Sequence, residues 1–430
     1  MSNSIREIRN DLLGDAYFEV KHPSGLTILV YPKKDYASTY AVFGTNYGSI
    51  DTFLKEKGGE AKALPEGTAH FLEHKLFESE ELDAFTRFAE TGAAANAYTT
   101  FDKTCYLFSC SSNFRENLKI LLDFVQHPYF TEETVRKEQG IIGQEIQMYQ
   151  DSPGWQVLFN LLRCLYQNHP VKIDIAGTAE SISRITADLL YGCYSSFYSL
   201  NNMVLTVAGN TTADEVLAVC DECLQTADPV YTERADYGEP ADIVEPYIAQ
   251  EFSVSMPILA MGFKETHGTP VRTLREKIIT GLLLDYIAGD TSELYNRLLS
   301  EGLINPGFDY EYFAGYGYAS VLFEGETKDP QKLAEEIKAE IRRVKAEGID
   351  PEAFERLRNM SYGKAIMGYN DVEDLANELV AAQFEGYHLF DEIGIYRSLT
   401  AADLEEQLQH QMNEEYCALS VVLPGKDEEL

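Results

Sequence analysis

Positive charge is scarce in this sequence of 430 residues, which has 35 lysines and arginines against 70 aspartates and glutamates. The formal net charge of −35 repels phosphate backbones and anionic lipid headgroups, so it argues against nucleic-acid and membrane-surface binding. A basic peptide substrate or a basic partner would be attracted instead. The same charge can also serve solubility alone, and the two explanations carry equal weight.

Long apolar runs and a regular cysteine spacing are absent as well. No stretch of about eighteen apolar residues occurs, so no transmembrane helix is expected, and the first residues lack the apolar core of a secretory signal. We therefore expect a cytoplasmic protein. The seven cysteines show no disulfide framework. Cys220 and Cys223 form a C-x-x-C pair without a second pair, so we expect ordinary helical cysteines in a reducing compartment rather than a zinc knuckle.

Histidine is also rare, with eight in the chain, yet two of them lie in His70-Phe71-Leu72-Glu73-His74. Residues four apart lie on one face of a helix, so both imidazoles can reach the same metal ion. Glu73 lies on that face too, where a carboxylate can take a proton from water. This is the inverted H-x-x-E-H order of zinc peptidases. The alternative is two surface histidines that flank a glutamate by accident.

A third metal ligand is expected, because catalytic zinc usually has three protein ligands and one open position. The best candidate lies on a helix predicted to begin at residues 131–133, where acidic side chains favour a helix N-terminus. Glu138 and Glu145 are seven apart and share a face of that helix. Their burial would be costly without a cation, which a zinc ion bound by His70, His74 and Glu145 would supply. Glu138 would then orient either a ligand or the other carboxylate. The alternative is two solvated glutamates.

Taken together, these motifs resemble those of the pitrilysin/insulinase family of zinc peptidases, in its smaller, processing-peptidase-like bacterial branch. The matching segments cover nearly the whole first half of the chain in the family's order, and the second half matches more weakly. They are Gly48-Ser49-Ile50-Asp51, residues 67–77, Asn96-Ala97-Tyr98-Thr99, Glu138 to Glu145, Ala176-Gly177-Thr178, Asn201-Asn202-Met203 and Val207-Ala208-Gly209.

The resemblance implies roles for particular residues. It assigns His70, His74 and Glu145 as zinc ligands, Glu73 as the general base, and Phe77, Asn96 and Ala97 as substrate contacts. It also implies an α+β fold of two homologous halves, each of paired α/β units with antiparallel sheets, packed as a clam. We expect residues 1–227 to form the zinc-bearing catalytic half, residues 228–250 an acidic linker, and residues 251–430 a non-catalytic homologous half.

Local patterns give expectations for individual elements. In the first half they predict a hairpin of strands 26–31 and 40–47, strands between 94 and 110, and a strand at 205–208. In the second half they predict a strand at 253–263, helices at 275–288 and 333–347, and aromatic-rich strands within 307–318. The aromatic face either lines a peptide chamber or, in the preferred interpretation, packs against a helix layer. When the two halves are aligned, Lys364 occupies the position of Glu145. The second half also contains no H-x-x-E-H sequence, so it has no metal motif.

The second half also departs from self-sufficient relatives of this family. They hold substrate with an arginine and a tyrosine, and here Leu299 and Asn305 occupy those places. Arg297, two positions earlier, is an imperfect substitute. In paired bacterial relatives, a zinc-less subunit supplies both groups. The resemblance therefore implies a heterodimer with a zinc-less paralogue in which this chain bears the zinc, and a homodimer stays open.

The function expected from the sequence is that of a zinc metalloendopeptidase acting on short unfolded peptides, either generally or on one dedicated peptide. The strand with Asn96 and Ala97 could pair with an extended peptide through main-chain hydrogen bonds. The alternative is a non-catalytic scaffold or regulatory subunit of the same family. Such subunits usually lose a motif residue, and this chain retains His70, Glu73 and His74. A metallohydrolase of another class is a weaker alternative, because the matches extend far beyond the metal motif.

Overall fold

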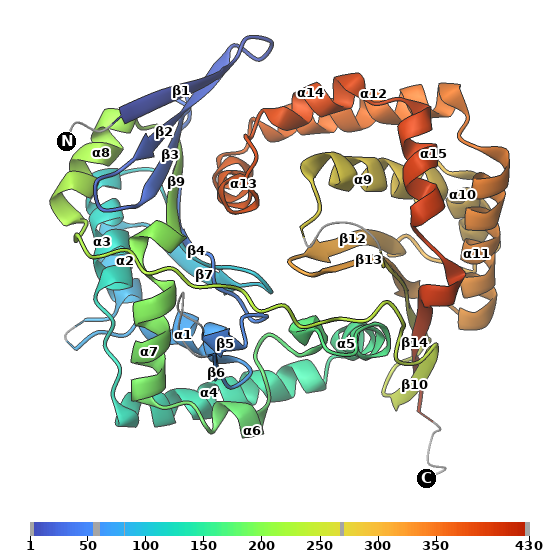
Figure 1. The fold of residues 1–430 in the computed structure, drawn as a ribbon, viewed down its shortest axis with the longest axis horizontal. Coiled ribbons are helices and arrows are strands. Elements are labelled where there is room, and N and C mark those ends of the chain that lie inside the picture. Colours follow the sequence, from blue (N-terminus) through green and yellow to red (C-terminus); the bar gives the residue numbers. More distant parts are fainter. Residues whose placement is uncertain (1–3, 55–60, 81, 267–270, 426–430) are drawn as a thin grey trace. The chain divides into compact units, whose positions relative to one another are not determined.

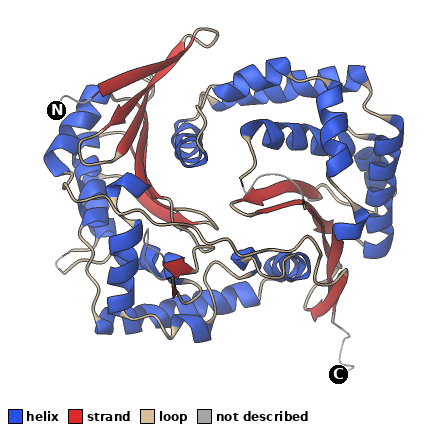
Figure 2. Cartoon of the chain, viewed as in Figure 1, coloured by secondary structure: helices blue, strands red, loops and turns tan. Residues whose placement is uncertain are grey.

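The computed structural model describes residues 4–54, 61–80, 82–266 and 271–425 (Figure 1). The chain forms two compact units, neither of which is a single continuous segment. Unit 1 comprises residues 1–146, 174–235 and 366–390, and unit 2 comprises residues 147–173, 236–365 and 391–430. Each unit combines helices with one main sheet (Figure 2), so the chain as a whole holds a pair of α/β units.

The main sheet of unit 1 has seven strands, and all neighbours in it are antiparallel except β3 and β9. Every residue of the central strands β4 and β9 is buried, as their continuous apolar sequences require. In spatial order the strands are β1 (Ser4–Asn10), β2 (Asp15–Lys21), β3 (Thr27–Pro32), β9 (Met203–Gly209), β4 (Thr39–Thr45), β8 (Thr104–Cys110) and β7 (Ala94–Thr99).

The hairpin predicted from strands 26–31 and 40–47 is wrong, although both strands exist. Strand β9 lies between them, parallel to β3 and antiparallel to β4. Each of these strands is apolar along its length, so periodicity predicts that it is buried but not which strand lies beside it. The expected strands at 94–110 and 205–208 are confirmed as β7, β8 and β9.

Helices cover both faces of this sheet. On one face lie α1 (Thr68–Leu76), α2 (Ala84–Thr91), α3 (Phe114–Gln126) and α8 (Ala213–Cys223), while α13 (Val372–Glu385) lies on the other (Figure 1). The close approach of α13 depends on Gly44 of β4, because an added Cβ there would lie 3.3 Å from the Val380 side chain. A helix from the second half of the sequence thus completes the sheet of unit 1.

Unit 2 has a five-stranded sheet in the order β10 (Tyr247–Phe252), β14 (Cys417–Pro424), β11 (Ile258–Lys264), β13 (Tyr318–Glu326) and β12 (Asp309–Gly315). Only β10 and β14 are parallel. One face packs on α9 (Leu274–Ala288), α11 (Pro330–Glu347) and α15 (Ala401–His410) in the core. The other receives α5 (Pro153–Leu165), whose Leu165 side chain lies 2.7 Å from where a Cβ on Gly262 would be.

The helices expected at 275–288 and 333–347 are confirmed as α9 and α11. The strand expected at 253–263 is confirmed only over β11, because residues 253–257 are irregular. Strand β10, which ends at Phe252, was not predicted. The aromatic side of β12 packs against the helix layer, as preferred from the sequence, and the Tyr310 hydroxyl donates to Asp285 of α9 at 2.7 Å. The α+β class with mainly antiparallel sheets is confirmed.

Each unit contains a helix that comes from the other half of the sequence. Helix α5 comes from the first half of the chain and packs in unit 2, whereas α13 comes from the second half and packs in unit 1. The predicted division into residues 1–227, a linker and residues 251–430 describes homologous halves rather than these units, and it stays a prediction. The packing of the two halves as a clam also stays a prediction. No helix in the described residues combines the length and apolarity that a membrane crossing requires.

The remaining elements connect these layers. They are β5 (Phe53–Leu54), β6 (Lys62–Ala63), α4 (Glu132–Gln150), α6 (Ala179–Ile182), α7 (Ala187–Phe197), α10 (Glu293–Ser300), α12 (Pro351–Gly368) and α14 (Asp391–Ser398).

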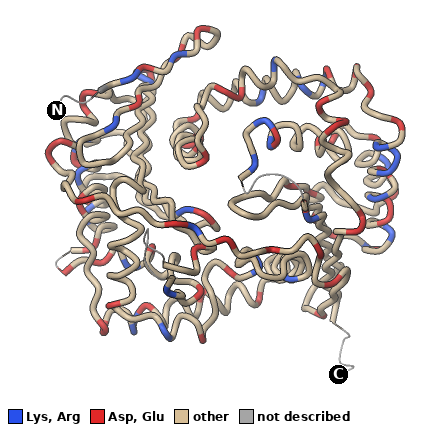
Figure 3. The backbone as a smooth tube through the Cα atoms, in the orientation of Figure 1, with Lys and Arg blue, Asp and Glu red and all other residues tan. Residues whose placement is uncertain are grey.

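Acidic residues occur throughout both units (Figure 3). Three of them lie close together on two neighbouring strands of the sheet of unit 2. Asp309 of β12 pairs with Glu324 of β13, and Glu311 lies two residues further along the same face. Among the described residues, no lysine or arginine forms an ion pair with these three carboxylates. Burial, together with the charges of Glu311 and Asp309, raises the pKa of Glu324 to about 7.

This raised pKa predicts that stability falls as the pH rises. The folded state favours protonated Glu324. Its contribution to folding stability is therefore present at low pH and is lost as the pH rises through about 7. Glu324→Gln should therefore raise the melting temperature at pH 8 and change it little at pH 5. Exposed Glu406 of α15 is the control, since Glu406→Gln should leave both values unchanged. Equal effects of Glu324→Gln at the two pH values would contradict this prediction.

Candidate metal centre and active site

Helix α1 places the two motif histidines side by side in the interior of unit 1. The helix begins after Gly67, which has a positive φ of 84° and lies against the backbone of Ala176, where a Cβ would be 2.4 Å from the carbonyl oxygen. Only glycine fits this position without strain. The rings of His70 and His74 have centroids 4.6 Å apart, and His70 is 8% exposed. The predicted helical spacing is confirmed.

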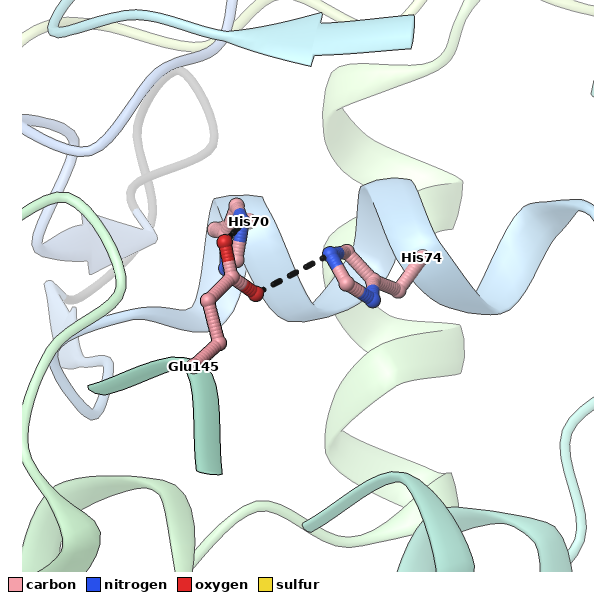
Figure 4. Close-up of side chains that lie close together, drawn as sticks. All are labelled: His70, His74 and Glu145. Carbon is pink, nitrogen blue, oxygen red and sulfur yellow. Dashed lines mark ion pairs between the residues drawn. The ribbon is translucent and has the colours of Figure 1, made fainter. Parts of the chain in front are cut away.

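Helix α4 brings a carboxylate to both rings. The helix begins at Glu132 with acidic side chains in its first turn, as the sequence predicted, and the Thr131 hydroxyl accepts the Thr134 N–H at 3.1 Å. One oxygen of Glu145 lies 3.6 Å from Nε2 of His70, and the other lies 3.6 Å from Nε2 of His74 (Figure 4). Donor atoms of the three side chains lie within 4.8 Å of one another.

This donor set fits zinc. Two ligands that are each about 2.1 Å from a tetrahedral zinc lie roughly 3.4 Å apart, close to the separations between Glu145 and the imidazole nitrogens. Two nitrogens and one carboxylate leave a fourth position open, which is the pattern of catalytic rather than structural zinc. In the described part of the chain, this is the one group of three or more such residues close enough to share a metal ion.

The other ring nitrogens differ in their surroundings. Glu138, 6% exposed, accepts from Nδ1 of His74 at 3.0 Å, which directs Nε2 of that ring toward Glu145. Nδ1 of His70 is buried and has no hydrogen-bond partner among the described residues. Burial lowers the pKa of His70 to about 3, so its ring is neutral and able to bind metal at neutral pH.

His74 lies in a more acidic environment. Burial alone would lower its pKa, but the hydrogen bond to Glu138 and the charges of Glu73, Glu138 and Glu145 outweigh burial and raise it. The three carboxylates thus favour a positive charge at this point. A bound cation would supply that charge in place of the proton.

Glu73 lies beside the histidines and is 8% exposed. Burial raises the pKa of its carboxyl group, against the opposing effects of His74 and of a hydrogen bond from Thr99. The Thr99 hydroxyl donates to Oε2 of Glu73 at 2.8 Å. The sequence analysis gave Thr99 no role, although it ends the motif that contains Asn96 and Ala97. Its contact with a residue 26 positions away could not be read from the sequence.

The predicted substrate contacts occupy different environments. Asn96 and Ala97 lie on β7, the outermost strand of its sheet, and the Asn96 side chain accepts the Ala97 N–H at 2.9 Å. Phe77 is 7% exposed at the end of α1 and stacks on Phe85, with ring centroids 4.1 Å apart. Phe85 itself is 48% exposed. The substrate role of Phe77, Asn96 and Ala97 stays a prediction.

Two charged residues fix the turn that follows β7. Asp51 accepts two hydrogen bonds from the Arg234 guanidinium, at 3.0 and 3.3 Å, and Arg234 also donates to the Asp102 carbonyl. Gly48 lets this loop approach the turn, since a Cβ there would lie 2.5 Å from the backbone of Phe101. The sequence analysis noted residues 48–51 as a motif but missed Arg234, which lies in the segment expected to be a linker.

In unit 2, the residues expected from the sequence to replace the family's arginine and tyrosine have ordinary surroundings. Leu299 of α10 is 37% exposed, and Asn305 donates to Glu326 at 2.9 Å. Arg297 forms ion pairs with Glu336 at 2.9 Å and Glu301 at 3.7 Å. It is therefore engaged within its own unit.

Comparisons with known proteins divide the chain in two. The family model described as Insulinase (Peptidase family M16) matches residues 58–179, the part that contains α1 and α4. The model described as Peptidase M16 inactive domain matches residues 184–361. All residues of the candidate metal centre fall in the first match.

Individual relatives match over the whole chain. The uncharacterized zinc protease YmfH of Bacillus subtilis (strain 168) is 37% identical over 428 residues, which cover 98% of this chain and 99% of that protein. The crystal structure of an M16-like peptidase from Alicyclobacillus acidocaldarius is similar, with 36% identity, a TM-score of 0.91 and 99% of each chain covered. Pitrilysin has a similar fold, with a TM-score of 0.74 at 16% identity, over 98% of this chain and 47% of its own.

The geometry predicts unequal roles for the two glutamates of α4. Glu145→Ala should reduce zinc affinity more than Glu138→Ala, because it removes a donor atom rather than the support of one. Loss of a residue that supports a metal ligand typically lowers metal affinity by about ten- to a hundredfold. Zinc content by mass spectrometry and competition with a chelator measure the difference, with exposed Glu133→Ala on the same helix as the control. Equal losses in the two variants, or a greater loss in Glu138→Ala, would refute this ranking.

Proposed function

The chain belongs to the insulinase family, peptidase family M16, and on that basis we propose that it is a zinc metalloendopeptidase acting on short unfolded peptides. The observation that carries this proposal is the group of His70, His74 and Glu145, with buried Glu73 next to it on the same helix. The name zinc protease given to a relative covered over 99% of its length supports the metal. Retention of every motif residue disfavours the scaffold alternative.

In the proposed mechanism, each residue of the site has a separate role. His70, His74 and Glu145 would hold zinc, which when bound supplies Lewis acidity that acidifies water and polarises a carbonyl. Glu73 would accept a proton from the attacking water and pass it to the leaving amine. Its burial raises its pKa and so makes the carboxylate a better base than an exposed glutamate. Glu138 would hold the ring of His74 in the ligating orientation.

Strand β7 supports an unfolded peptide as substrate. It is the last strand of its sheet, so main-chain groups on its outer side face no neighbouring strand. An extended peptide could pair with this edge, while a folded protein offers few free main-chain groups. Such pairing gives affinity with little sequence preference.

A second subunit is part of the proposal. The chain spans about half of pitrilysin, and Leu299 and Asn305 replace the arginine and tyrosine expected in self-sufficient relatives. We infer a heterodimer with a zinc-less paralogue, with a homodimer as the alternative. A cytoplasmic location is supported by the seven cysteines, all of which are free thiols.

The proposed base can be tested by Glu73→Gln, which keeps the size of the side chain but removes its basicity. Zinc should stay bound, and cleavage of an unstructured peptide should fall by at least about a hundredfold. Exposed Glu90 of α2 provides the control, because Glu90→Gln should keep full activity. Zinc content and a fluorogenic peptide assay, both with the partner present, are the measurements. An active Glu73→Gln variant would rule out the mechanism.

The two-subunit arrangement predicts weak activity of the chain alone. Loss of one preorganised donor can reduce turnover by roughly a hundred- to a thousandfold. Titration with a zinc-less paralogue that carries the arginine and tyrosine should raise activity until the ratio reaches 1:1. A paralogue variant without that arginine should still bind this chain but should restore little peptidase activity. Full activity of the isolated chain would refute the heterodimer, and activity that rises with its own concentration would favour the homodimer.

A further inference from the structure

We propose that Thr99 is a positioning residue that holds the carboxylate of Glu73 and links it to the peptide-binding edge of β7. The inference rests on the proposed function, since it concerns the same site. Its starting point is the hydrogen bond from the Thr99 hydroxyl to Oε2 of Glu73 at 2.8 Å. No other described residue donates a hydrogen bond to this carboxylate.

The hydroxyl of Thr99 has one proton, and the geometry selects its acceptor. The oxygen of Thr104 is the other candidate, at 3.4 Å, whereas Oε2 of Glu73 is 0.6 Å nearer and belongs to a charged group. Hydrogen bonds to ionised acceptors are shorter and stronger than neutral ones. Thr104 donates its own proton to the Tyr47 carbonyl at 2.9 Å, so it does not compete for Glu73.

This contact gives the two oxygens of Glu73 different roles. Oε2 is occupied by Thr99, while Oε1 accepts no hydrogen bond from the described residues and is not cut off from solvent. A water proton would therefore be taken at Oε1. Because Thr99 is β-branched, its side chain has few rotamers, and it holds the carboxylate plane in one orientation.

The backbone of Thr99 is aligned with the open edge of the sheet. In an antiparallel pair, residues alternate between bonding the neighbouring strand and facing away from it. The Thr100 N–H bonds the Lys103 carbonyl at 2.8 Å, so the main-chain groups of Thr99 and Ala97 face away from β8. The Ala97 N–H accordingly bonds the Asn96 side chain instead of β8. Thr99 thus offers main-chain groups to a peptide and its hydroxyl to the base.

The next residues fix this position firmly. The Thr100 carbonyl accepts the Ser49 N–H at 3.0 Å, and the Phe101 carbonyl accepts the Ile50 N–H at 2.9 Å. Arg234 adds its hydrogen bond to the Asp102 carbonyl. The end of β7 is therefore held from the sheet side and from the loop side. A peptide paired with β7 would take its register from the same residue that orients Glu73.

Substitutions at Thr99 separate the hydroxyl from the rest of the side chain. Thr99→Val keeps the shape and removes the donor, whereas Thr99→Ser keeps the donor and removes the methyl group. With the partner subunit present, Thr99→Val should lower kcat by about ten- to a hundredfold, the usual effect of losing a supporting hydrogen bond at a metal site. KM should change little, because the main-chain edge is intact. Thr99→Ser should keep most of the activity, and zinc content should stay at the wild-type level in both variants.

The outcomes separate this inference from the proposed function. If Thr99→Val retains wild-type kcat while Glu73→Gln is inactive, Thr99 does not position the base, and the proposed function stands. If Glu73→Gln is active, the proposed function itself fails. A Thr99→Ser variant as impaired as Thr99→Val would assign the effect to packing of the methyl group and overturn the inference, as would loss of zinc from Thr99→Val. Should Thr99→Val fold poorly by circular dichroism, Thr99→Ala must show the same loss of kcat at unchanged KM.

Discussion

The packing of two buried carboxylates and one partly buried carboxylate, those of Glu73, Glu138 and Glu145, next to two imidazoles is the constraint on which the rest of unit 1 depends. Glu73 and Glu138 are 8% and 6% exposed, and their charges act on His74 together with that of Glu145. Negative charges so close together are costly inside a protein unless a cation neutralises them. Protonation of His74 offers one positive charge, and a divalent ion would offer two. These carboxylates and imidazoles come together where α1 and α4 meet, and such concentrations of shifted pKa values are typical of active sites.

The surrounding elements make this arrangement specific. Gly67 allows α1 to begin against the backbone of Ala176, so the position of the helix is set by a contact that no side chain could replace. The hydrogen bond of Glu138 selects the nitrogen of His74 that remains available, and that of Thr99 orients Glu73. Each of these two proposed active-site groups thus has a supporting partner from a different element, and preorganisation of this kind is what the proposed chemistry requires.

The exchange of helices between the units makes the half that carries His70, His74 and Glu145 dependent on the other half. Helix α13 lies on β4 and β9, and the Thr206 hydroxyl of β9 donates to the Ala376 carbonyl of α13 at 2.8 Å. Without α13, a face of completely buried strands would be open to water. The second half of the chain, which has no metal motif, therefore has a structural role in unit 1. That role gives a physical reason for a silent half within one polypeptide.

The sequence alone determined the local chemistry. The spacing of His70, Glu73 and His74 fixed their common helix face, and the spacing of Glu138 and Glu145 did the same on α4. Local patterns also marked β4 and β9 as strands. These properties depend on neighbours within a few residues, which helix and strand geometry place directly. Only the tertiary structure decided that β9 separates β3 from β4, that Thr99 and Arg234 support the site, and that α5 and α13 change units. Those contacts join residues far apart in the chain, and many partners would satisfy the same apolar surface or hydrogen-bonding group, so no local pattern selects among them.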